Sequence, residues 1–136
     1  MGIIATISSI VSLANGFLSL KEKLFPRHKK DAIADWLDKV SHALLELEQE
    51  LRNGNYPHEK CAYLRYCLNA MIDMLNAYLS STEIDNLYGL AEQSYQVERL
   101  FYELKNMSNE DREMNLAKIL EAAGTFKACS DILKVR

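Results

Sequence analysis

Residues 33–51 read IADWLDKVSHALLELEQEL, and the apolar side chains of this stretch recur at helical spacing. The apolar positions are Ile33, Trp36, Leu37, Val40, Leu44, Leu47 and Leu51. Intervals of three and four residues place such side chains on one face of an α-helix, and the acidic residues of the stretch lie mostly off that face. This pattern predicts an amphipathic helix over about 29–52.

Three further stretches of the 136-residue chain repeat this periodicity, at about 58–80, 83–106 and 109–134. Turn and capping residues separate them, namely NGNYP at 53–57, the segment 80–82, and Ser108. Gly124 lies within the last stretch, where glycine costs about 1 kcal/mol relative to alanine and is a candidate kink. The chain has only 5 glycines and 2 prolines, and no stretch alternates with period two, so strands are not expected.

These features predict an all-α fold in a single domain over residues 1–136. We expect residues 29–136 to form a four-helix up-down bundle, because short loops join neighbouring helices in antiparallel fashion. An apolar N-terminal helix with a basic segment after it, together residues 1–25, brings the expected total to about five helices.

The N-terminal stretch reads IIATISSIVSLANGFLSL over residues 3–20, and residues 1–20 carry no ionisable side chain. As a helix, these residues extend about 27 Å, close to the roughly 30 Å of bilayer hydrocarbon. The candidate membrane-inserting side chains are Ile3, Ile4, Ile7, Ile10, Val11, Leu13, Ala14, Phe17, Leu18 and Leu20. An alternative stays open: this helix packs within the bundle at rest. The two states are compatible if activation releases the helix.

Small side chains repeat along the same stretch. Ser8, Ser12 and Gly16 are four residues apart, the small-xxx-small spacing that lets two helix backbones approach closely in lipid. These three residues are therefore candidate helix–helix contacts in a membrane-bound oligomer. The alternative is close packing within a single copy of the chain.

The formal charge of -3 conceals an uneven distribution. Residues 21–30 carry five basic side chains and one acidic side chain, a net charge of +4, whereas the rest of the chain sums to -7. The five basic residues, which we call the basic collar, are Lys21, Lys23, Arg27, Lys29 and Lys30. Each would contribute about 1 kcal/mol on an anionic membrane, so lipid headgroups are an expected partner. The acidic remainder lacks the Lys/Arg stripe of a nucleic-acid-binding protein, and no nucleic-acid partner is expected.

Residues suited to catalysis or metal binding do not cluster in the sequence. The three cysteines, Cys61, Cys67 and Cys129, are odd in number and lack metal-ligand spacing, which favours buried free thiols in a reducing cytosol. The three histidines lie in different stretches, without the spacing of a zinc or di-iron site. We therefore predict no catalytic site, no metal and no cofactor, and a protein that is not an enzyme.

The order of these features resembles that of the HeLo-like cell-death domains. An aliphatic, serine-rich first helix (ISSIVSLA, residues 7–14), a basic segment and a helical bundle follow one another. The family includes the fungal HeLo domains, the N-terminal domain of the mixed-lineage-kinase-like pseudokinase, and the bacterial Bell domain of amyloid-signalled immunity. Two features differ: the first acidic residue is Glu22, whereas some fungal relatives carry a functional glutamate in the first helix, and residues 127–136 contain no evident amyloid motif.

The resemblance implies a membrane-targeting, pore-forming or permeabilising cell-death effector of innate immunity, such as antiphage defence. In such a protein an upstream signalling protein triggers self-association. The cytoplasmic domain then relocates to the membrane, and the segment from Ile3 to Leu20 inserts. The alternative is a soluble adaptor or assembly subunit without membrane activity. It would bind a partner protein through the first helix or through a surface bearing Tyr56, Tyr63, Tyr66 and Tyr78.

Overall fold

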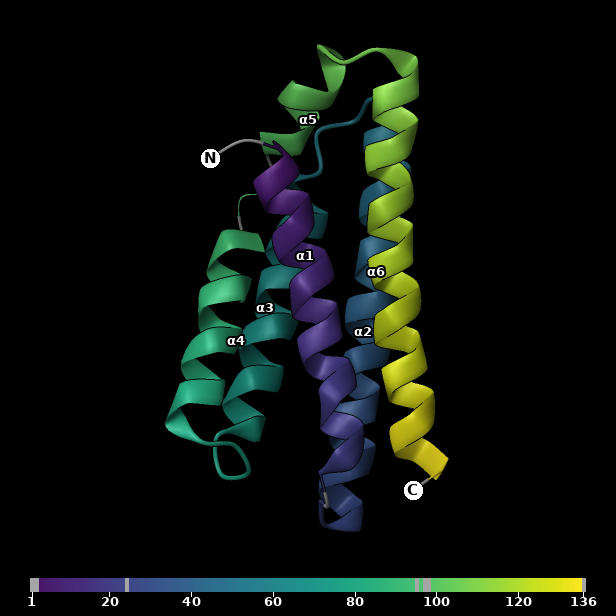
Figure 1. Ribbon diagram of the computed structural model, residues 1–136. Helices are drawn as coiled ribbons and strands as arrows, with labels where there is room; N and C mark the ends of the chain where they lie inside the picture. Colours follow the sequence, from purple (N-terminus) through teal and green to yellow (C-terminus); the bar gives the residue numbers. More distant parts are fainter. Residues whose placement is uncertain (1–2, 24, 95, 97–98, 136) are drawn as a thin grey trace.

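The computed structural model describes residues 3–23, 25–94, 96 and 99–135. The elements are α1 (Ile3–Leu18), the 3-10 turn η1 (Ser19–Glu22), α2 (Arg27–Arg52), α3 (His58–Leu75), α4 (Ser81–Ser94), α5 (Arg99–Lys105) and α6 (Asn109–Val135). Within these ranges the chain forms helices and no strands (Figure 1), which confirms the all-α prediction.

The longer helices close into a bundle in the spatial order α1, α6, α2, α3, α4 and back to α1. We call these helices the main bundle. The chain direction alternates from α1 through α4, while α5 lies across the end where α4 finishes and α6 begins (Figure 1). The N-terminal helix is therefore a member of the bundle wall, between α4 and α6, and is not enclosed by all the other helices.

The most extensive pairing joins α2 to α6 through small residues. The Ser41 hydroxyl donates to the Ala123 carbonyl at 2.8 Å, and the Ser130 hydroxyl donates to the Ala34 carbonyl at 2.9 Å. Both serines are buried. Because side chains this small let backbones approach closely, the two longest helices form a seam fixed by hydrogen bonds as well as by packing.

Ion pairs extend this seam toward solvent. Arg52 Nε donates to the buried Glu48, and Arg52 Nη1 donates to Glu113 on α6. Hydrogen bonds from Arg52 to Glu113 and Glu48 raise the pKa of the guanidinium above its ordinary value. At the other end, partial burial alone would raise the pKa of Asp38, but hydrogen bonds from Lys134 and Lys127 lower it. Pairing at both ends fixes the register of α2 against α6.

The prediction of one helix over 83–106 is wrong, because α4 ends at Ser94 and α5 begins at Arg99. An α-helix turns about 100° per residue, so a continuous helix would direct Leu100 and Leu104 about 140° away from Leu87 and Ala91. All four side chains are buried. The chain must change direction to bury both sets, and this phase change is visible in the sequence. Tyr95 and Val97, which the predicted helix over 83–106 included, lie outside the described residues.

The structure confirms the predicted starting points of the two helices that follow α3 and α5. The Ser80 hydroxyl accepts a hydrogen bond from the Glu83 amide at 3.1 Å, and the Glu83 carboxylate accepts one from the Ser80 amide at 3.0 Å. This reciprocal pair is a capping box, and it begins α4. The Ser108 hydroxyl likewise accepts from the Asp111 amide at the start of α6. The third helix ends at Leu75, earlier than expected, because a turn precedes Ser80.

Gly124 does not interrupt α6, which runs as one helix from Asn109 to Val135. The residue is exposed, and a Cβ added there would have no neighbour within 4 Å.

We predict that Gly124→Ala raises the free energy of unfolding by about 0.5–1 kcal/mol, because alanine lacks the backbone entropy cost of glycine in a helix. Urea denaturation measures the change. Gly54→Ala is the control and should destabilise, since Gly54 has a φ of 78°. A loss of stability in Gly124→Ala would contradict the prediction.

Candidate functional site

The first helix presents one apolar face to the core and one polar face to solvent. Six of the candidate membrane-inserting side chains, five in α1 and Leu20 in η1, are at most 2% exposed: Ile7, Ile10, Leu13, Ala14, Phe17 and Leu20. Val11 and Leu18 are partly buried, and the side chains of Ile3 and Ile4 lie outside the described part of the structure. The outward face carries the exposed residues Ser8, Ser12, Asn15 and Ser19. At rest, therefore, the apolar face of α1 is covered by the bundle.

Phe17 anchors α1 against α6. Its ring lies 5.8 Å from the ring of Phe126, and both side chains are buried. The Cys129 thiol donates to the Phe17 carbonyl at 3.0 Å. Burial raises the pKa of the Cys129 thiol to about 12, so the thiol keeps the proton that it donates at neutral pH. This contact ties the last turn of α1 to the C-terminal half of α6.

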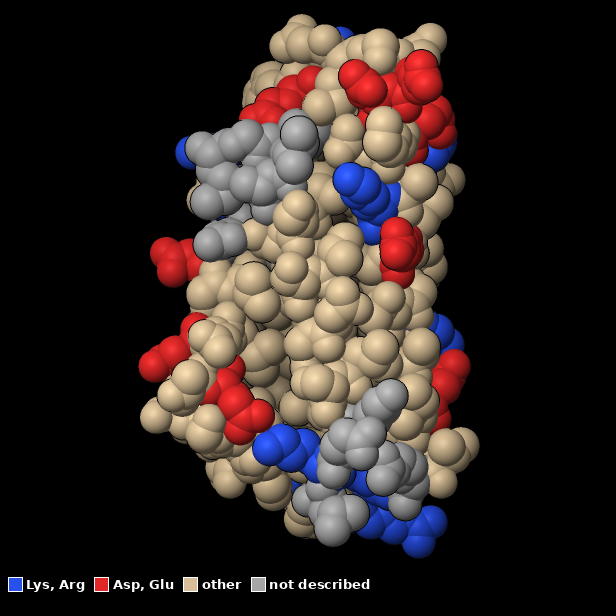
Figure 2. All heavy atoms as spheres, in the orientation of Figure 1, with Lys and Arg blue, Asp and Glu red and all other residues tan. Residues whose placement is uncertain are grey.

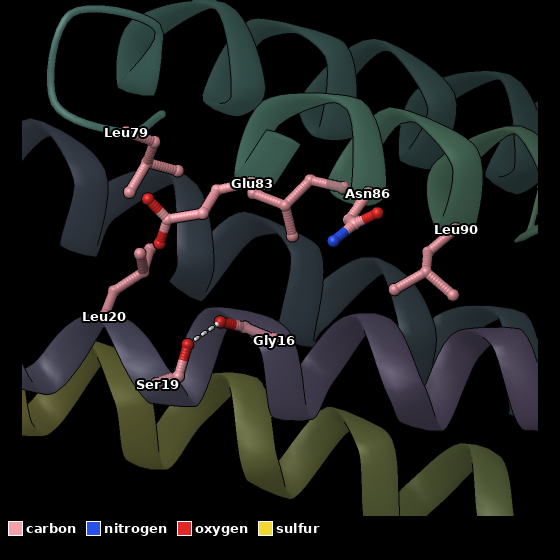
Figure 3. Close-up of a pocket in the computed structure, with 8 residues that line it drawn as sticks. Gly16, Ser19, Leu20, Leu79, Glu83, Asn86 and Leu90 are labelled. Carbon is pink, nitrogen blue, oxygen red and sulfur yellow. Dashed lines mark hydrogen bonds between the residues drawn. The ribbon is translucent and has the colours of Figure 1, made fainter. Parts of the chain in front are cut away.

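Gly16 sets the approach of α1 to α4. A Cβ added at Gly16 would lie 3.3 Å from Leu87 Cδ2, so a residue larger than glycine requires the Leu87 side chain to move by a few tenths of an ångström. Beside this contact lies a groove of about 270 Å³ between the two helices (Figure 3). Its lining residues are Gly16, Ser19, Leu20, Leu79, Glu83, Asn86, Leu87 and Leu90. Gly16 thus makes a helix–helix contact within the chain, whereas Ser8 and Ser12 face solvent.

The surface around α1 is uncharged over a broad area. In Figure 2 the centre of this view shows no Lys, Arg, Asp or Glu atoms, while acidic side chains gather near the beginning of α6 and basic ones near the opposite end. The acidic end includes Glu110 and Asp111 in the first turn of α6. The uncharged outer face of α1 therefore lies between ends of opposite charge.

The basic collar gathers at the end of the bundle where α1 finishes and α2 begins. Lys23 lies 3.5 Å from Glu83 of α4, and a backbone hydrogen bond from Ser80 lowers the pKa of that carboxyl. In the part of the chain that is described, Arg27, Lys29 and Lys30 form no ion pair, and the Lys21 side chain lies outside it. Arg27 and Lys30 line a hollow of about 410 Å³ together with Lys134 of α6.

The start of α2 is electrostatically unfavourable as a helix end. Its first turn contains no acidic residue, and Pro26 supplies no side-chain cap. Cations near a helix N-terminus oppose the helix dipole, where acidic residues would stabilise the helix. The collar thus lowers local stability, and its positive charge is available to an external anion.

Exposed aromatic residues form a second surface, along α2 and α3. The Trp36 ring lies 5.8 Å from that of Tyr66, and Lys39 Nζ lies 4.2 Å from the centre of the Trp36 ring system. Tyr66 is 64% exposed and Tyr63 is also exposed. Of the tyrosines considered from the sequence, Tyr56 is exposed as well, whereas Tyr78 is partly buried against Phe25. The sequence indicated the tyrosines as a candidate surface for a partner protein, but it could not show that Trp36 lies beside Tyr66.

The cysteines are free and buried, which confirms the prediction of packed thiols. No group of three His, Cys, Asp or Glu side chains with metal-binding geometry occurs in the described ranges. Among the helices whose residues are described, none is both long enough and apolar enough to cross a membrane. The first helix has 16 residues, shorter than the apolar stretch of the sequence, because residues 19–22 form a 3-10 turn.

Comparison of the chain with protein-family models, with curated proteins and with solved structures finds no match. The chain is a small all-helical domain.

Proposed function

We propose that the chain is a membrane-permeabilising effector domain of the HeLo-like type, which acts after self-association through α1 in a defence response. The observation that carries the proposal is the position of α1. A helix without charged side chains occupies the wall of the bundle between α4 and α6, and the basic collar follows it directly.

The resting state holds α1 mainly by apolar packing. Burial of a large apolar side chain stabilises by about 1.5–3 kcal/mol, so the six buried side chains together hold α1 with a free energy on the order of 10 kcal/mol. Spontaneous release is therefore rare. Contact with lipid and with neighbouring copies of α1 must favour the released state to shift this balance.

The collar supplies the attraction to an anionic surface. Arg27, Lys29 and Lys30 have no ion-pair partner among the described residues. Their positive charges can therefore interact with an anionic membrane without the prior breaking of ion pairs within the chain. They lie at the end of the bundle where α1 finishes, so binding there brings the last turn of α1 to the headgroups.

The test is dye release from vesicles of phosphatidylglycerol and phosphatidylcholine, with the chain fused to a tetrameric coiled coil to impose self-association. We expect release by the fusion, and a large loss of release in the double variant Lys29→Glu and Lys30→Glu. The matched control is Lys105→Glu with Lys118→Glu, which makes the same change in net charge away from the collar and should retain release. Absence of leakage from anionic vesicles by the parent fusion would overturn the proposal.

The alternative is an adaptor domain, and the exposed Tyr63 and Tyr66, with the partly buried Trp36 beside Tyr66, favour it. Tyrosine and tryptophan are enriched among residues that carry binding energy at protein interfaces. Substitution of Tyr63 and Tyr66 by Ser distinguishes the two functions. The substitutions should leave vesicle leakage unchanged if α1 is the active element, whereas an adaptor would lose its partner.

A further inference from the structure

A hollow of about 250 Å³ lies at the end of the bundle that α5 covers. Two parts of the chain that are distant in sequence meet there: the end of α2 with the turn after it, and α5 with the start of α6. The lining residues are Leu51, Arg52, Gly54, Phe101, Leu104, Lys105 and Arg112. The hollow is at the opposite end of the bundle from the collar.

The apolar wall of the hollow has a fixed aromatic ring. Phe101 is held edge-on by Tyr56, at 5.4 Å and 80°, and by Tyr102, at 5.1 Å and 82° between ring planes. Leu51 and Leu104 are buried and complete this wall. A flat apolar molecule can pack here without first ordering the side chains, which reduces the entropic cost of binding.

The polar wall of the hollow carries three basic side chains, Arg52, Lys105 and Arg112. Arg52 is engaged by Glu48 and Glu113. Lys105 and Arg112 form no ion pair in the described ranges. Lys105 Nζ lies 5.1 Å from the centre of the Phe101 ring, and Arg112 Nε donates to the Leu104 carbonyl at 3.3 Å. These contacts position both cations at the hollow.

We propose that this hollow binds a small aromatic anion, of the aryl carboxylate or aryl sulfonate class. The aromatic body packs against Phe101, Leu51 and Leu104, and the acid group pairs with Arg112 and Lys105. Planar guanidinium groups suit such acids because they donate two parallel hydrogen bonds. The volume lies below the usual range of about 300–1,000 Å³ for ligand sites, so the ligand has one or two fused rings. This site is independent of the proposed membrane function.

The probe is 5-dimethylaminonaphthalene-1-sulfonate, a two-ring aryl sulfonate whose fluorescence rises in an apolar site. We expect saturable binding by the folded chain, with 1-naphthoate displacing the probe and 1-naphthylmethylamine failing to displace it. Lys105→Met and Arg112→Met should each weaken binding about tenfold, the usual loss for one charge-assisted hydrogen bond. Phe101→Leu should also weaken binding, through loss of the aromatic wall.

The matched control is Lys118→Met, which removes one positive charge on α6 outside the hollow and should leave affinity unchanged. Circular dichroism of each variant verifies the fold. If loss of the Arg112–Leu104 contact loosens α5 in Arg112→Met, the Lys105→Met variant still tests the proposal, because it keeps that contact. Equal affinity in the parent chain and the Lys105→Met, Arg112→Met double variant would overturn the proposal, as would absence of saturable binding.

Discussion

A disulfide between positions 16 and 87 is expected to abolish vesicle permeabilisation, and reduction of that disulfide is expected to restore it. The variant carries Gly16→Cys and Leu87→Cys. A Cβ at position 16 would lie 3.3 Å from Leu87 Cδ2, so the two positions face each other across the α1–α4 seam. If permeabilisation requires α1 to leave the wall of the bundle, a covalent bond to α4 prevents it.

Geometry favours this pair over the native thiols. Leu87 Cδ2 is two bonds from Leu87 Cβ, so the two Cβ atoms lie within about 6 Å of each other, and the groove beside Gly16 leaves space for the adjustment to the roughly 3.5–4.5 Å of a disulfide. Cys61, Cys67 and Cys129 are at most 2% exposed, so they do not compete under brief oxidation. Mass spectrometry of the oxidised chain verifies that the bond forms between the intended positions.

Two controls distinguish the effect of the disulfide on permeabilisation from the effects of the substitutions themselves. The reduced double variant and the single variant Gly16→Cys should both permeabilise vesicles of phosphatidylglycerol and phosphatidylcholine under the conditions used for the parent fusion. If the oxidised double variant causes the same release as its reduced form, α1 does not need to separate from α4 and the proposed mechanism is wrong.

Sequence periodicity is most reliable where a helix has one charged face and one apolar face. The helix α2 is of this kind, and its predicted range agrees with the structure to within a few residues; the range of α6 agrees as well, although Met114 and Leu120 of α6 are exposed. The structure places Ser8, Ser12, Asn15 and Ser19 on the solvent face of α1, whereas Ser8 and Ser12 were predicted as helix–helix contacts. By contrast, the division of 83–106 required attention to the phase of the stripe as well as its spacing.

Spatial neighbours could not be predicted, because periodicity gives the buried face of a helix but not the helix that covers it. Ser41 and Ala123 are separated by 82 residues, and only their contact identifies the α2–α6 seam. The sequence therefore left open whether α1 lies at the centre or in the wall of the bundle. For the same reason the hollow under α5 could not be predicted, because its lining residues Leu51, Phe101 and Arg112 come from separate segments of the chain.

Replacement of Phe17 by Ala is expected to lower the free energy of unfolding by about 3–5 kcal/mol, the usual cost of removing a buried phenylalanine side chain. Phe17 is fully buried, packs on Phe126 and lies at the Cys129 contact, so few neighbours can move to fill the cavity. Urea denaturation measures the loss. Ser12→Ala on the exposed face of α1 is the control and should change stability by less than about 0.5 kcal/mol.

Which helices lose stability in Phe17→Ala tests whether α1 separates from the bundle as a unit. If α1 separates as a unit, hydrogen exchange in Phe17→Ala should accelerate in α1, while the amides of α2 and α6 stay protected by the hydrogen-bonded seam. The tetrameric fusion of the same variant should then permeabilise vesicles at lower protein concentration than the parent fusion, because less free energy holds α1 in place. Equal acceleration in all helices would instead mean that the bundle opens as a whole. In that case α1 is a structural member of the wall, and a function that depends on its separate release would not follow.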